Sequence, residues 1–296
     1  MDKKYFLGID GGGTKTAFIV IDDNNEIVYQ NVLGPSSLDT VPLIDIEKLL
    51  LTEGKNIPYK ISAIFAGIGG ISCDSDKLLI NNILKKFDCL LPTGKVESDN
   101  DVINALYGSL CAQDGIVIIA GTGSVAFGKW KGQYARSGGY CYQEGDAGSA
   151  YYIGYRALQY LARVIDGRKE ESTLSKELME IIKCYDYSSL ASYFVNATRT
   201  QIAKLAPVVC SNKSKEALEI VEDAVEEMIE MIVAVYRRLN INNEECLFSI
   251  IGSLGNNSNL YKGLLLEKLE KINPKINYIP KMHDASFGAS LKAKSL

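Results

Sequence analysis

The chain has 296 residues, of which 47% are hydrophobic and 23% charged, with a formal net charge of -4. This composition predicts a globular protein with one large or two ordinary domains, and the mild acidity argues against nucleic acid or an anionic membrane as a partner. The sequence has no run of about 18 apolar residues, so no membrane span is expected, and it shows no secretory signal. Its seven cysteines include no C-x-x-C pair, which favours a reducing cytoplasm.

The first third of the chain is expected to form three strands and then alternating helices and strands. The expected strands cover residues 5–9, 17–22, 26–32, 61–66 and 95–98, and the expected helices cover residues 42–54, 75–87 and 101–111. This order predicts an α/β fold with a mixed sheet and helices on its faces.

The rest of the chain repeats the opening pattern. Residues 115–130 (GIVIIAGTGSVAFGKW) predict a strand, a glycine turn and a second strand, so a second domain built like the first is expected. Residues 146–239 are expected to be mostly helical, and an apolar stripe at 216–238 predicts a core helix. A strand and glycine turn at 247–257 precede helices expected at 259–271 and 284–293. The domains are expected at residues 1–114 and 115–283, with residues 284–296 packing back on the first.

The loop GIDGGGTKT, residues 8–16, lies between two expected strands. Rossmann and Walker A loops both require a helix after the glycines, so neither fits. Successive glycines let main-chain N–H groups approach an anion, and phosphate is the expected guest. Asp10 would repel a phosphate unless a cation lies between them, so the loop also predicts Mg²⁺ held largely through water. The single histidine, His283, is near the C-terminus, so proton transfer is expected from an aspartate or a glutamate.

Three glycine turns in a fixed order carry a family resemblance. FLGIDGGGTKT, AGTGS and IIGSLGNN resemble the two phosphate loops and the adenosine loop of the actin, hexokinase and sugar-kinase superfamily. The block GGYCYQEGDAGSAYYIG, residues 138–154, resembles the N-acetylglucosamine kinase and BadF/BadG/BcrA/BcrD ATPase family. The resemblance covers the chain from residue 5 to its FGASL tail. It implies two ribonuclease-H-like, actin-like ATPase domains with ATP in a cleft between them.

The resemblance also implies how the cofactors ATP and Mg²⁺ would be held. The implied contacts are Gly11, Gly12, Gly13, Thr14 and Lys15 for the β- and γ-phosphates, Gly121, Thr122, Gly123 and Ser124 for the second phosphate turn, and Gly252, Ser253 and Asn256 for adenosine. Asp10 would lie beside the Mg²⁺ ion.

The catalytic base of the family follows the strand that ends near Glu97. The family pattern matches Asn100-Asp101-Val102, so Asp101 is the expected base and Asp99 the runner-up. Such a carboxylate orients a sugar hydroxyl and accepts its proton, which contributes roughly 10²- to 10⁴-fold in rate. Capping of the helix expected at 101–111 is the alternative role for this stretch.

Asp146, in GDAGS, resembles the residue that accepts hydrogen bonds from sugar hydroxyls, although it also suits the N-cap of a helix at 147–164. The other implied substrate contacts are Ser37, Gly69, Gly70, Asp101, Gly138, Gly139, Tyr140, Ser149 and Ala150. The family often has asparagine where Ser37 stands, and Gly-Trp-Gly where this chain has GYCY. Both departures lie where the substituents of the sugar should sit, so N-acetylglucosamine, glucosamine and N-acetylmuramic acid all remain open.

The predicted function is ATP-dependent phosphorylation of a small amino sugar, at O6. An ATP-driven activator of a 2-hydroxyacyl-CoA dehydratase or benzoyl-CoA reductase is the alternative. Such an activator shares a 4Fe–4S cluster between two subunits, and each must supply two cysteines. Cys141 lies near the right region, and the sequence offers no convincing second ligand. A sugar-binding regulator without turnover is a third hypothesis. Because many family members are dimers, a homodimer is one expected state.

Overall fold

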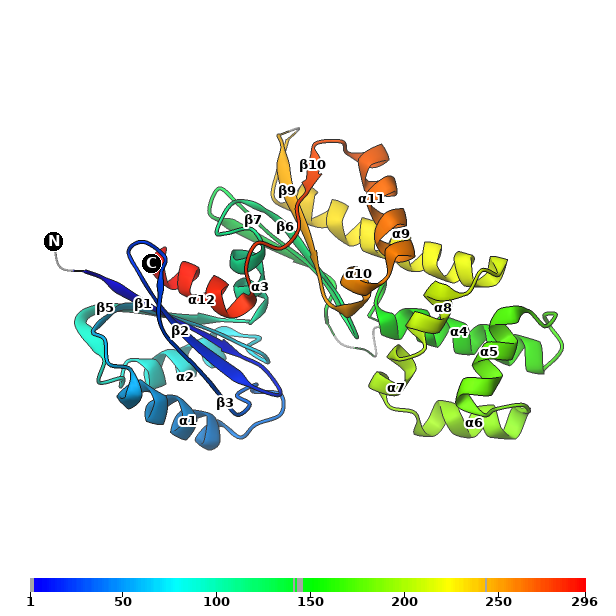
Figure 1. The fold of residues 1–296 in the computed structure, drawn as a ribbon, viewed down its shortest axis with the longest axis horizontal. Helices are drawn as coiled ribbons and strands as arrows, with labels where there is room; N and C mark the ends of the chain where they lie inside the picture. Colours follow the sequence, from blue (N-terminus) through cyan, green and yellow to red (C-terminus); the bar gives the residue numbers. More distant parts are fainter. Residues whose placement is uncertain (1–2, 141, 143–145, 243) are drawn as a thin grey trace. The chain divides into compact units, whose positions relative to one another are not determined.

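The computed structural model describes residues 3–140, 142, 146–242 and 244–296. They fold as two compact units (Figure 1): unit 1 comprises Met1–Gln113 and Pro280–Leu296, and unit 2 comprises Asp114–Ile279. Each unit is built on one five-stranded sheet. Among the described residues, no helix combines the length and the apolar character needed to cross a membrane.

The sheet of unit 1 has the strand order β3-β2-β1-β4-β5. Its strands are β1 (Tyr5–Gly11), β2 (Thr16–Asp22), β3 (Ile27–Leu33), β4 (Ile61–Ile68) and β5 (Leu90–Asp99). The first three form an antiparallel meander, because short turns join β1 to β2 and β2 to β3, and β4 and β5 then add in parallel. All five strands were predicted, and the expectation of a mixed sheet is confirmed.

Helices cover both faces of this sheet. They are α1 (Leu43–Asn56), α2 (Asp74–Leu84), α3 (Val102–Ser109) and α12 (Ala285–Lys294). Leu7 and Ile9 of β1 share a core with apolar side chains of α1 and α2. The alternate residue Gly8 faces α12, where an added Cβ would overlap the backbone of Ser290. The last helix (red in Figure 1) therefore packs on the first strand and on α3.

The sheet of unit 2 has the order β10-β9-β6-β7-β8, which is the same topology. Its strands are β6 (Gly115–Ala120), β7 (Ser124–Trp130), β8 (Gln133–Ser137), β9 (Cys246–Ile251) and β10 (Ile276–Tyr278). β6, β7 and β8 form the antiparallel meander, and β9 and β10 add in parallel. The repeat expected from residues 115–130 is therefore confirmed. The sequence did not predict β8 and β10, because both are short and carry polar residues.

The helices of unit 2 lie mainly between β8 and β9 in the chain. They are α4 (Ala150–Ile165), α5 (Thr173–Ile182), α6 (Tyr187–Asn196), α7 (Arg199–Ala203), α8 (Ala206–Ser211), α9 (Lys215–Arg238), α10 (Ser253–Asn257) and α11 (Asn259–Ile272). The apolar stripe of α9 is buried, as predicted, and forms the centre of the unit 2 core. The turn expected after β9 contains the short helix α10.

Candidate functional site

The loop between β1 and β2 presents main chain at the surface of unit 1. Gly11 pairs with Thr16 at the end of the hairpin, and the Gly12 N–H donates to the Lys15 carbonyl at 3.0 Å. Gly13, Thr14 and Lys15 are exposed. The loop is therefore a short, glycine-rich surface turn with a lysine at its end, as an anion-binding loop requires.

Asp10 lies at the base of this loop. Asn104 Nδ2 donates to Asp10 Oδ1 at 2.7 Å and to the Gly67 carbonyl at 3.0 Å. Burial raises the pKa of Asp10, whereas the Asn104 hydrogen bond and the charge of Lys15 lower it. The described residues contain no group of three or more His, Cys, Asp or Glu side chains that could hold a metal. A single carboxylate of this kind fits Mg²⁺ bound largely through water and phosphate oxygens.

Four of the predicted substrate residues lie together in unit 1. A Cβ added to Gly69 would lie 3.1 Å from Ser37 Oγ and 3.4 Å from Asp101 Oδ2. Gly70 has φ +85°, and a Cβ there would lie 2.7 Å from the Asp39 nitrogen. Glycine is required at Gly70, because its φ is positive and the Asp39 nitrogen approaches closely, whereas a Cβ at Gly69 would be tight against Ser37.

Asp99 and Asp101 have different surroundings. Asp99 Oδ2 pairs with Lys77 Nζ at 2.7 Å, and its Oδ1 accepts from the Asn100 N–H at 2.7 Å. Asp101 is the N-cap residue of α3, but its side chain makes no capping hydrogen bond. A capping hydrogen bond therefore does not account for the Asp101 carboxylate, and its role as the base stays a prediction.

The turn between β6 and β7 in unit 2 is covered by the start of α4. The Gly121 carbonyl accepts from the Ala150 N–H at 2.9 Å, and the Thr122 carbonyl accepts from the Tyr151 N–H at 3.3 Å. Ser124 Oγ donates to the Ala147 carbonyl at 2.5 Å. These bonds hold the turn against the segment that contains Asp146.

Asp146 is not the N-cap of α4, and the helix does not begin at residue 147. Asp146 and Gly148 both have positive φ, which interrupts the helical path, so α4 starts at Ala150 with Ser149 as its cap. Asp146 is 3% exposed and accepts an ion-paired hydrogen bond from Arg199. A Cβ on Gly123 would lie 2.9 Å from Asp146 Oδ1, so the turn and the acid are in close contact.

The remaining predicted substrate residues of unit 2 are less closely grouped. Gly138 and Gly139 have φ +71° and +69°, and Arg136 donates to both of their carbonyls. Tyr140 is 83% exposed. Ser149 is buried, and its Oγ accepts from the Tyr152 N–H as a helix cap. Residues 141 and 143–145 lie outside the described residues.

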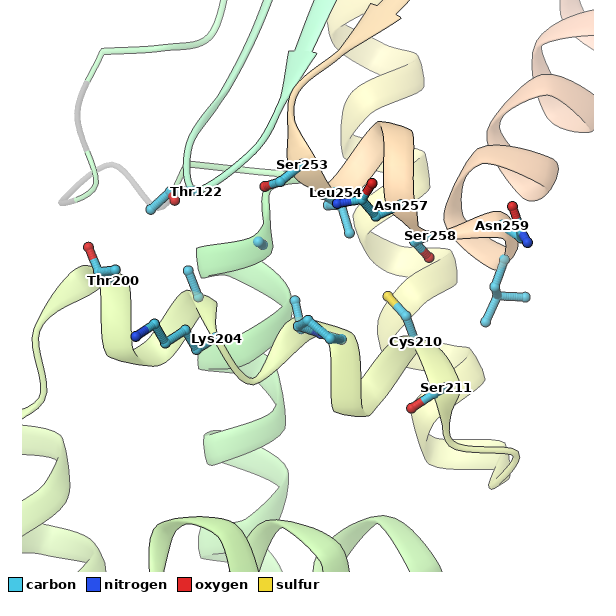
Figure 2. Close-up of a pocket in the computed structure, with 15 residues that line it drawn as sticks. Thr122, Thr200, Lys204, Cys210, Ser211, Ser253, Leu254, Asn257, Ser258 and Asn259 are labelled. Atoms are coloured by element: carbon cyan, nitrogen blue, oxygen red, sulfur yellow. The ribbon is translucent and has the colours of Figure 1, made fainter. Parts of the chain in front are cut away.

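A cavity of about 500 Å³ opens beside the turn in unit 2 (Figure 2). Its lining includes Thr122, Ala150, Thr200, Lys204, Ser253, Leu254 and Asn257. Its size is in the range that takes small ligands and cofactors. Gly252, with φ +96°, turns the chain from β9 into α10 beside the Ala120 carbonyl. Of the three residues predicted for adenosine, Ser253 is among the residues that line this cavity. The asparagine that lines it is Asn257, not the predicted Asn256.

The amino-acid sequence matches a known protein family over nearly its whole length. The model of the BadF/BadG/BcrA/BcrD ATPase family matches residues 7–293. The chain belongs to this family. It is 30% identical over 305 residues to the N-acetylmuramic acid/N-acetylglucosamine kinase of Clostridium acetobutylicum, with 99% of each chain covered. It is 28% identical to the N-acetyl-D-glucosamine kinase of Dictyostelium discoideum, covering 99% of this chain and 98% of the relative.

Solved structures show the fold of this BadF/BadG/BcrA/BcrD member. A protein from Chromobacterium violaceum, 23% identical, matches 97% of this chain and 98% of its own with a TM-score of 0.71. The predicted family and the predicted α/β fold of two ribonuclease-H-like, actin-like ATPase domains are therefore confirmed.

Arg199 is one of the site residues that the sequence did not predict. It lies 53 positions after Asp146, so no local motif joins the two. One signal was present. The pattern Thr198-x-x-Gln201 is a capping box that places Arg199 in the first turn of a helix. This pattern predicts the short helix but not the acid that Arg199 contacts.

Proposed function

We propose that the protein transfers the γ-phosphoryl group of ATP to a hydroxyl of an amino sugar. The curated relatives that are 30% and 28% identical to it are named as amino-sugar kinases. The observation that carries the proposal is the position of the Asp101 carboxylate beside Gly69, where Ser37 also approaches.

In this proposal, main-chain groups of two turns hold the nucleotide phosphates. The exposed loop Gly11–Lys15 contacts the β- and γ-phosphates, and the turn Gly121–Ser124 provides the second phosphate contact. The cavity lined by Ser253 and Asn257 takes the adenosine. When bound with the nucleotide beside Asp10, Mg²⁺ supplies positive charge to the phosphates.

Asp101 acts as the general base on the sugar. A sugar hydroxyl is a weak nucleophile, so a carboxylate within hydrogen-bond reach orients it and accepts its proton as the bond to phosphorus forms. Asp146, held by Arg199, accepts hydrogen bonds from other hydroxyls of the ring. We propose O6 as the attacking oxygen, because a primary hydroxyl is the least hindered of the sugar hydroxyls.

The chemistry of the substrate is a hexosamine, either free or N-acylated. Ser37 and the segment 138–142 border the region of the sugar substituents in this proposal. The alternative of an electron-transfer activator depended on Cys141, which lies outside the described residues.

The deciding experiment is a screen for ADP release in a coupled assay with MgATP. The panel contains glucose, glucosamine, N-acetylglucosamine and N-acetylmuramic acid. We expect Mg²⁺-dependent turnover with at least one amino sugar, and a product heavier by one phosphoryl group whose position is read by phosphorus-coupled NMR. Absence of turnover on the whole panel, together with iron and a brown colour in the purified protein, would favour the activator instead.

A further inference from the structure

A buried carboxylate lies directly against a proposed phosphate turn. Asp146 is 3% exposed, and its Oδ1 would lie 2.9 Å from a Cβ added to Gly123. Its backbone has φ 43°, an unusual conformation for a residue other than glycine. The chain therefore accepts backbone strain to place this acid beside the turn.

A lone acid at this position would oppose nucleotide binding. Like charges a few ångströms apart repel strongly where water is excluded. The turn can bind a polyphosphate only if the charge of Asp146 is compensated. The compensating group among the described residues is Arg199, whose guanidinium donates to Asp146 Oδ2.

Arg199 is held in place by its helix and by a ring. Thr198 Oγ1 caps α7 by accepting from the Gln201 N–H at 3.2 Å, so Arg199 occupies the first turn. Its guanidinium carbon lies 5.9 Å from the centre of the Tyr142 ring. Its Nε is buried and has no hydrogen-bond partner among the described residues. Since Arg has five N–H donors, the ion pair with Asp146 does not exhaust them.

The same helix continues into the cavity. Thr200 and Lys204 line it together with Thr122 of the turn, and Figure 2 shows all three around the opening. Arg199, which pairs with the acid, thus directly precedes Thr200, a residue that lines the proposed nucleotide cavity.

We propose that Arg199 is a charge-balancing positioning residue, which allows Asp146 to bind sugar hydroxyls next to a phosphate-binding turn. This inference rests on the proposed function, because it assumes that Gly121–Ser124 contacts nucleotide phosphates. Arg199 and Asp146 act as one electrostatic unit, in which removal of the cation alone leaves a carboxylate that repels the nucleotide.

The test is a double-mutant cycle read by calorimetric binding of MgATP and of adenosine. We expect Arg199→Met to weaken MgATP binding at least tenfold and to change adenosine binding less than twofold. Asp146→Asn should bind MgATP at least as tightly as the wild type, while the KM for sugar rises. The combination of both substitutions should restore MgATP binding to within threefold of Asp146→Asn, and Arg199→Lys should keep most of the affinity.

Arg156→Met is the matched control. Arg156 pairs with Asp223 at 2.9 Å on the surface of the same unit, and both side chains are exposed. We expect its loss to leave the binding constants for MgATP and adenosine unchanged. Equal loss of MgATP and adenosine binding in Arg199→Met would show a purely structural role and overturn the proposal. The proposal would also be overturned if adding Asp146→Asn to Arg199→Met failed to restore MgATP binding.

The outcome also separates this proposal from the proposed function. A wild-type protein that binds no nucleotide and phosphorylates no sugar would refute both. A wild-type protein that phosphorylates an amino sugar, while Arg199→Met retains normal MgATP affinity, would refute only the role of Arg199.

Discussion

Replacing Asp101 by asparagine tests the proposed base directly. The substitution keeps the size of the side chain and its ability to hydrogen-bond, but it removes the proton acceptor. Because the Asp101 side chain makes no capping hydrogen bond to α3, the helix should form normally. We therefore expect a folded protein that binds MgATP as the wild type does and turns over slowly.

The size of the effect follows from the role. General-base assistance contributes roughly 10²- to 10⁴-fold, which is about 2.7 to 5.4 kcal/mol in the activation free energy at 1.36 kcal/mol per tenfold change. Loss of a helix cap would instead lower the melting temperature and leave kcat nearly unchanged. The expected result is a fall in kcat of at least a hundredfold in a protein that remains folded at the assay temperature.

Asp99→Asn is the matched control in the same stretch. It breaks a partly exposed ion pair with Lys77, which is worth about 1 kcal/mol or less. We expect its kcat to stay within about fivefold of wild type. The assay is ADP release at saturating MgATP and sugar, with melting temperatures measured in parallel. The reasoning is refuted if Asp101→Asn turns over normally or if Asp99→Asn is the variant that loses activity.

Three further predictions concern stability. Since burial raises the pKa of Asp10 above its ordinary 3.8, the folded state without Mg²⁺ loses stability as the pH rises through that pKa. Asp10→Asn should therefore melt at a higher temperature than the wild type at pH 7 in EDTA, and this difference in melting temperature should shrink toward pH 4. The variant should also lose kinase activity. A melting temperature below that of the wild type at pH 7 would contradict the prediction. Gly252→Ala places a Cβ 2.5 Å from the Ala120 carbonyl at a residue with φ +96°, so it should lower the free energy of unfolding by about 1 to 3 kcal/mol in chemical denaturation. Gly263→Ala, which has open space around it in α11, should instead raise the free energy of unfolding by up to about 1 kcal/mol. Glu53 is buried and accepts hydrogen bonds from three side chains. Glu53→Ala should therefore lower the free energy of unfolding by about 2 to 4 kcal/mol in chemical denaturation. A decrease of less than about 1 kcal/mol would count against a stabilising role for these hydrogen bonds.

The elements of unit 1 and the central strands of unit 2 were predictable because their signals are local. Alternating apolar residues define a strand, a 3.6-residue stripe defines α9, and glycines mark the ends of β1, β6 and β9. These signals act over a few residues, so the sequence by itself determined the strand–turn–strand repeat and the family. They were too weak for β8 and β10, whose three to five residues gain stability only by pairing with strands that are already in the sheet.

Tertiary structure alone decided how the acids of the site are surrounded. Asp99 and Asp101 are two positions apart and look alike in the sequence, but Asp99 meets Lys77, which lies 22 positions earlier. For Asp146 the sequence suited both a sugar contact and a helix cap, whereas the positive φ of its backbone and its pairing with the distant Arg199 depend on the tertiary structure. Ion pairs and close approaches of this kind join residues that are far apart in the chain, so they depend on packing that no local pattern encodes.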